Sequence, residues 1–229
     1  SSNLIDRFVL KAMTLHGLSP APPVDRRRLI RRMFVDALGV PPSSEDWEKL
    51  VGLSESVWQE RLVSELLGRV SFGERWARHW LDVVRYTETA GHVQDLERPY
   101  TWLYRDYVIR ALNADHPYDK FLSDHLIGDL LGKGGGGRDG WNAAQATGFL
   151  WFHEMHFRPV DPIGQRADQV DAQVDVISKA FLGLTVSCAR CHDHKFDPIS
   201  QKDYYALAGV LHNTEWVLAD EGFKENAVS

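Results

Sequence analysis

The sequence predicts a mainly α-helical fold, an irregular multi-helix domain with long loops. Apolar residues recur every three or four positions along most of the chain, as in Ile5, Phe8, Ala12 and Leu15. Glycine and proline separate these periodic segments, and no convincing run of alternating apolar and polar residues predicts strands. The chain has 229 residues, 44% of them hydrophobic and 25% charged, which is enough to build a sizeable core.

Helical segments separated by chain breakers fill the first 131 residues. Gly17 ends the first of them, and the prolines of 20–23 form a stiff link to the second. A short third helix is expected just after Ser43, which forms a capping box with Asp46. The other helices are expected at 4–15, 24–38, 56–67, 72–86, 99–113 and 117–131. The helix at 72–86 opens on a second capping box of this spacing, Ser71 with Glu74.

The glycine-rich stretch 132–140 is interpreted as a surface linker, because it lacks the Gly-Lys-Ser/Thr ending of a phosphate-binding loop. It separates two possible sub-units, 1–131 and 141–229, although a single domain over 1–229 is favoured. Beyond it we expect a weak helix at 141–150, an irregular segment at 151–162 and a long helix at 166–182. A brief extended lead-in at 184–186 and a last helix at 200–211, capped by Ser200 and Asp203, complete the chain's predicted elements.

The strongest chemical signal is a Cys-x-x-Cys-His motif formed by Cys188, Cys191 and His192, which contains the only two cysteines of the chain. This arrangement is the recognition sequence for covalent attachment of c-type haem. Two thiols one helical turn apart can reach the two vinyl groups of a porphyrin, and the adjacent imidazole can ligate the iron. The sequence therefore predicts haem c, with Cys188 and Cys191 as thioether anchors and His192 as the proximal iron ligand.

Two other interpretations of the motif stay open: a zinc or non-haem iron site, and a plain dithiol. A zinc site usually needs four ligands, commonly from a second Cys/His pair, and the chain has no such pair at metal spacing. His194 could join the motif around a small metal ion, but four ligands so tightly spaced would be strained. In the haem interpretation His194 is instead expected to support the site without binding iron, to contact a propionate, or to lie on the surface.

The sixth iron ligand would decide the function. His79 is a distal candidate, since its spacing from Trp76 places it on the apolar face of the helix at 72–86, although a histidine there is more often a core residue. His153, Met155 and His156 fall in the irregular segment and are further candidates. Two strong axial ligands are typical of an electron carrier, whereas an open position permits small-molecule chemistry.

Charged residues give little support for a polyanionic or membrane partner. The net charge is −6, and no apolar run is long enough to span a bilayer. One predicted helix is rich in arginine, but a solvated face is favoured there over a nucleic-acid site. These arginines are Arg26, Arg27, Arg28, Arg31 and Arg32. A solvated face is likewise favoured over cation binding for Asp168, Asp171 and Asp175.

The stretch 188–199, Cys-Ala-Arg-Cys-His-Asp-His-Lys-Phe-Asp-Pro-Ile, resembles the planctomycete-type cytochrome-c-like domain, a family of unknown function in exported bacterial proteins. Further blocks that resemble the family occur in order along nearly the whole chain. They lie at 5–8, 29–42, 73–82, 105–109, 128–131, 146–150 and 180–185. The resemblance implies that the chain is one domain of a larger protein. His79 and His194 fall inside such blocks, whereas 132–140 and 153–156 do not.

The expected function is that of a c-type haem domain for electron transfer in the bacterial cell envelope, with a redox protein or an adjacent domain as its partner. Haem c is attached outside the cytoplasm of bacteria, so this interpretation implies export, with the leader absent from the sequence. One alternative is a haem-dependent oxidoreductase with an open iron, and another is a structural or interaction module stabilised by zinc or non-haem iron. The residues do not decide whether the protein is an enzyme.

Overall fold

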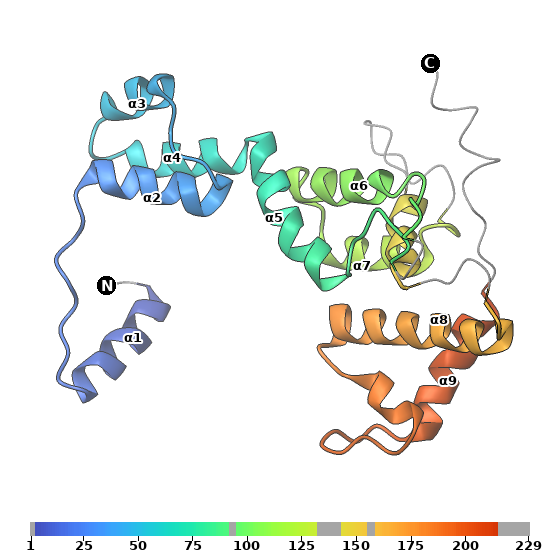
Figure 1. Cartoon of the computed structure of the whole chain (residues 1–229). Coiled ribbons are helices and arrows are strands. Elements are labelled where there is room, and N and C mark those ends of the chain that lie inside the picture. The colour runs from blue at the N-terminus through green and yellow to red at the C-terminus, as the bar shows by residue number, and fades with distance from the viewer. Residues whose placement is uncertain (1–2, 92–94, 132–142, 155–158, 215–229) are drawn as a thin grey trace. The chain divides into compact units, whose positions relative to one another are not determined.

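The structure is a computed structural model that describes residues 3–91, 95–131, 143–154 and 159–214 (Figure 1). It confirms a mainly helical fold, and the described residues form no strand beyond an isolated bridge between Thr89 and Glu97. The chain divides into two compact units, Ser1–Leu66 and Leu67–Ser229. This boundary differs from the linker expected at 132–140, which lies outside the described residues.

The first unit contains four helices: α1 (Leu4–Leu15), α2 (Arg26–Leu38), α3 (Ser44–Val51) and α4 (Trp58–Leu67). Ile30, Phe34 and Leu38 form the buried stripe of α2, at the spacing of four that an amphipathic helix requires. Arg26 lies over the ring of Trp58, with its guanidinium carbon 4.8 Å from the ring centroid. The same guanidinium donates to the backbone oxygens of Leu50 and Leu53, so it joins three helices of this unit.

The second unit is built around an aromatic core. It comes from α5 (Val70–Val83), α6 (Trp102–Asn113), α7 (Tyr118–Ile127) and the 3-10 helix η1 (Ala143–Trp151). This core contains the fully buried rings of Tyr107 and Phe149, and the ring of Tyr104, which is only 2% exposed. Because η1 packs against both α6 and α7, the segments before and after 132–142 contribute to the same core.

The rest of the second unit carries the cysteine motif. It consists of α8 (Pro162–Ile177), a π-helical turn η2 (Ser178–Leu182), a 3-10 helix η3 (Val186–Arg190) and α9 (Gln201–His212). Gly183 ends η2 in the left-handed conformation, with φ 66°, at the position the sequence predicts. Val174 and Ala189 are fully buried in a second core cluster that α8, η3 and α9 share. Ile177 contacts both clusters and so connects the motif to the aromatic core.

Two of the three predicted capping boxes are confirmed. Ser43 with Asp46 caps α3, and Ser200 with Asp203 caps α9. The box of Ser71 with Glu74 is wrong, because α5 begins at Val70 and Ser71 lies inside its first turn. Asn113 of α6 replaces it: its Oδ1 accepts from Gly73 N at 2.9 Å, and its Nδ2 donates to Val70 O at 3.1 Å.

Candidate functional site

The cysteine motif begins on η3, one turn of helix that has a buried and an exposed side. Val186 and Ala189 point into the second core cluster. Cys188 and Cys191 are free and exposed to solvent. The backbone N–H of Cys188 donates to Thr185 O at 3.1 Å, which closes the turn. The motif thus presents both thiols at the surface of a segment whose other side is anchored.

His192 follows the second cysteine and is also exposed. Its Nδ1 lies 2.7 Å from the backbone oxygen of Asp193. Because a carbonyl oxygen only accepts, Nδ1 must carry the proton in this hydrogen bond. In the neutral ring, Nε2 therefore carries a lone pair that is available to a metal ion. This tautomer and this backbone partner are typical of histidines that ligate metals.

His194 has a different arrangement, in which both ring nitrogens are engaged. Its Nδ1 accepts from the backbone N–H of Asp197 at 2.8 Å and from that of Phe196 at 3.3 Å. The proton must then reside on Nε2, which donates to Thr185 Oγ1 at 2.9 Å. With its side chain only 6% exposed, His194 ties the turn after the motif to the residue that precedes η3. It holds the shape of the motif and has no nitrogen free for a metal ion.

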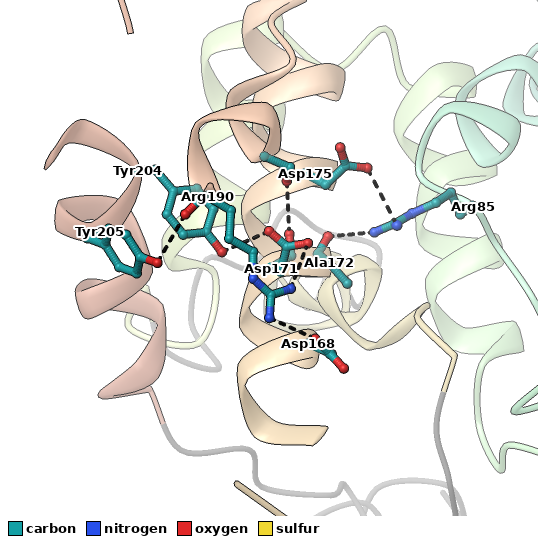
Figure 2. Close-up of polar contacts among 9 residues, drawn as sticks. Arg85, Asp168, Asp171, Ala172, Asp175, Arg190, Tyr204 and Tyr205 are labelled. Carbon is teal, nitrogen blue, oxygen red and sulfur yellow. Dashed lines mark hydrogen bonds and ion pairs between the residues drawn. The ribbon is translucent and has the colours of Figure 1, made fainter. Parts of the chain in front are cut away.

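Arg190, between the two cysteines, anchors the motif to α8 (Figure 2). Its guanidinium lies 2.9 Å from Asp168 Oδ1 and 3.4 Å from Asp171 Oδ2. Tyr204 of α9 donates to the other oxygen of Asp171 at 2.8 Å. The hydrogen bond to Asp168 raises the pKa of Arg190, and burial together with Asp171 raises the pKa of Tyr204. Asp171 therefore joins α8, η3 and α9 at one point.

The start of α9 holds the backbone of the motif. Tyr205 donates from its hydroxyl to Arg190 O at 3.1 Å (Figure 2). The side chain of Gln201 donates to the same oxygen at 3.3 Å. The backbone N–H of Gln201 donates to Asp193 Oδ1 at 2.8 Å. Side chain and main chain of Arg190 are thus both fixed, which places Cys188 and Cys191 on a rigid support.

The prediction of a solvated face for the three aspartates of α8 is wrong for Asp171 and Asp175. Asp171 binds Arg190 and Tyr204. Asp175 lies 2.7 Å from Lys179 Nζ and 3.6 Å from Arg85 Nη1. Only Asp168 stays largely in solvent, with 71% of its side chain exposed. The Asp-x-x-Asp-x-x-x-Asp spacing together with an arginine between the cysteines was the available signal for this anchor.

Replacing Asp171 with alanine should lower the free energy of unfolding by about 2 kcal/mol, because it leaves the buried hydroxyl of Tyr204 without its acceptor. Asp168→Ala is the matched control, and its exposed ion pair should contribute about 0.5 kcal/mol or less. Urea unfolding followed by circular dichroism measures both, and hydrogen exchange of 186–191 reports the anchor itself. Equal effects of the two substitutions would contradict the assigned role of Asp171.

The distal candidates lie elsewhere. His79 is exposed and its ring is 5.4 Å from that of Trp76, so its expected place on the core face is wrong; Ala77 and Leu81 form that face. His153 is buried, and its Nδ1 donates to Glu154 O at 3.1 Å. Met155 and His156 lie outside the described residues. Within the described part of the chain, no hydrogen bond, ion pair or ring contact joins His79 or His153 to the cysteine motif.

His153 belongs to a second polar feature, a cavity of about 280 Å³ at the end of α5. Burial lowers the pKa of His153, and the positive charges of Arg98 and Arg85 lower it further. Arg98 is itself buried and donates to the backbone oxygens of Thr89, Trp151 and His153. These bonds fasten the loop after α5 to the end of η1.

The described residues contain no group of three or more His, Cys, Asp or Glu side chains placed to hold a metal ion. Nor is any helix within those ranges long and apolar enough to cross a lipid bilayer.

Comparison with known proteins gives one match. A family model described as PSCyt2, a protein of unknown function (DUF1549), matches residues 4–216. No curated protein and no solved structure matches the chain. The resemblance to a planctomycete-associated family of unknown function is confirmed, and the match includes the whole cysteine motif. Since it covers nearly the whole chain, the protein belongs to the PSCyt2 family.

Proposed function

We propose that the protein binds haem c covalently through Cys188 and Cys191, with His192 as the proximal iron ligand, and transfers electrons in the bacterial cell envelope. One observation carries this proposal: two exposed thiols and an imidazole with a free Nε2 stand on one anchored turn. These are the groups that attachment of haem c requires, in the order that it requires.

The donor set fits the chemistry of attachment. Each thiol adds across one vinyl group, so that a sulfur–carbon bond forms and the thiol proton moves to the other vinyl carbon. Both cysteines must reach solvent for this addition, and both do. When bound, haem supplies an iron that changes its charge by one electron, and this is the basis of electron transfer.

The protein's own residues would position the group. The hydrogen bond from His192 Nδ1 to Asp193 O fixes the ring and makes Nε2 a better donor to iron. Arg190 and His194 hold the turn from two sides, which limits the motion of both anchors. The engaged nitrogens of His194 also favour haem over a small metal ion held by the motif, which would need His194 as a ligand.

Export follows from the same proposal, because haem c is attached outside the cytoplasm. The electron partner would be a redox protein or a neighbouring domain of the same polypeptide. Both the location and the partner are inferred from the cysteine motif alone.

A haemochrome experiment tests attachment. The chain is produced together with the c-haem maturation machinery, denatured, and examined as the pyridine haemochrome. We expect covalent haem in the wild type and none in Cys188→Ser/Cys191→Ser, while Lys202→Ala, altered only at an exposed position of α9, keeps it. A wild type without covalent haem, produced beside a cytochrome c that is loaded normally, would contradict the proposal.

Carbon monoxide separates an electron carrier from an enzyme with an open iron. An iron with two protein ligands should bind carbon monoxide slowly after reduction, since a ligand must leave first. Immediate binding at the stopped-flow dead time would contradict the electron carrier and favour the haem-dependent oxidoreductase.

A further inference from the structure

A hollow on the surface of the first unit is independent of the cysteine motif. It lies between α2 and α3, has a volume of about 410 Å³, and is lined by Arg27, Arg28, Arg31, Ser44 and Trp47. Three of its five lining residues are arginines and a fourth is an indole. We call this feature the arginine groove.

The positive charge of the arginine groove is poorly neutralised. Arg27 and Arg31 are one helical turn apart, and neither has a carboxylate at ion-pair distance among the described residues. Like charges at this spacing destabilise a helix. Arg28 contacts Asp25 at 3.3 Å, but both side chains are exposed and such pairs are weak. An anion entering the groove would therefore meet cations that are available.

Two of the three acidic residues of the facing helix, Glu45 and Asp46, are already engaged, and the third, Glu48, does not line the groove. Glu45 lies 2.7 Å from Lys49. The Asp46 carboxylate accepts from the backbone N–H and the hydroxyl of Ser43, at 2.9 and 2.8 Å, and is buried as part of the cap. These contacts direct both carboxylates to α3 itself, so the groove keeps its positive character.

Trp47 gives the groove an apolar wall. Its indole is half-buried, and the guanidinium carbon of Arg27 is 5.9 Å from the ring centroid. Guanidinium groups bind phosphate and sulfate in a bidentate manner, and an indole face stacks on a flat or sugar ring. The two elements lie side by side, so one small molecule can use both.

We propose that the arginine groove binds a small ring compound that carries a phosphate or sulfate ester. The ester lies against Arg27, Arg28 and Arg31, and the ring against Trp47. This site is separate from the proposed haem site and stands whether or not haem is attached. A nucleoside monophosphate and a sulfated monosaccharide share this chemistry, and both serve as probes.

Calorimetric titration of the full chain tests the proposal with adenosine monophosphate, glucose 6-sulfate and inorganic phosphate. We expect at least one ester to bind more tightly than inorganic phosphate. Arg27→Gln/Arg31→Gln should weaken that binding at least about tenfold, equivalent to 1.4 kcal/mol. Trp47→Ala should remove the preference for the ester over inorganic phosphate, while Trp47→Phe, which keeps a ring, should retain part of it.

The matched control is Arg32→Gln/Arg61→Gln, which removes the same charge from exposed positions outside the groove. It should leave the affinity within about twofold. An equal loss in both double variants would assign the binding to net charge and overturn the site. Absence of ester binding in the folded wild type, or esters that bind no better than inorganic phosphate, would overturn it as well.

Discussion

Replacing Gly128 with alanine should lower the free energy of unfolding by about 3 kcal/mol. Gly128 follows α7 at the point where η1 crosses it. A Cβ at this position would lie 2.2 Å from the backbone oxygens of both Ala143 and Asp124. Ala143 belongs to η1 and Asp124 to α7 itself, so relief requires both a displacement of η1 from α7 and a change of the backbone at the end of α7.

Gly209→Ala in α9 is the matched control for this prediction. No heavy atom lies within 4 Å of a Cβ built at Gly209. In a helix interior, alanine is favoured over glycine by about 1 kcal/mol, so this variant should be slightly more stable than the wild type. Urea unfolding of the two variants measures the difference. If Gly128→Ala unfolds at the wild-type urea concentration, the packing of η1 on α7 is not as described.

The helical class and several helix ends are predictable from the sequence, because they depend on neighbours in the chain. The capping boxes at Ser43 and Ser200 join residues three positions apart. Gly39 and Gly183 end their helices in the left-handed conformation that glycine adopts without strain. Such local rules need no knowledge of the tertiary structure.

The predictions are wrong where a residue distant in the chain determines the local structure. Asn113 caps α5 from 40 positions away in the chain, so Ser71 is not needed as a cap. His79 was expected in the core because Trp76 shares its face of the helix. The structure places Trp76 at the surface and turns the small residue Ala77 inward. Hydrophobicity alone does not show that the close packing of α5 on α6 requires a small side chain there.

The candidate site divides in the same way. Cys188, Cys191 and His192 can be found from spacing, because haem attachment requires them to be adjacent in the chain. The contacts that hold these residues in place cannot be found from spacing, because Arg190 binds Asp168 of α8, 22 positions away in the chain. The sequence shows charges that can pair, but only the packing of α8 against η3 selects which of them do.

A fully buried histidine also has no clear signal in the sequence. His125 of α7 is the acceptor in a chain of hydrogen bonds: Trp80 Nε1 donates to the hydroxyl of Tyr104 at 2.8 Å, which donates to His125 Nε2 at 2.9 Å. His125 Nδ1 donates to Phe121 O at 2.7 Å. The neutral ring satisfies every partner, whereas a proton on Nε2 would remove the acceptor of Tyr104. Burial among aromatic rings lowers the pKa of His125 to about 4, from an ordinary value of 6.5.

This shift makes the second unit sensitive to acid. Between pH 6.5 and about 4, His125 takes up a proton in the unfolded chain but not in the folded protein. The free energy of unfolding should therefore be fully retained above pH 6.5 and should fall by about 3 kcal/mol from this residue as the pH drops through that window. Urea unfolding at pH 7, 5.5 and 4 measures the dependence.

The variant His125→Gln separates this contribution from that of the carboxylates. It should be less stable than the wild type at pH 7, because ring contacts with Phe121 and Phe149 are lost. Its stability should nevertheless fall by about 3 kcal/mol less than that of the wild type between pH 6.5 and 4, since no imidazole titrates in the core. His212→Gln, altered at an exposed position in the last turn of α9, should keep the wild-type slope. If His125→Gln and the wild type lose stability in parallel, the proton is not excluded from the folded core.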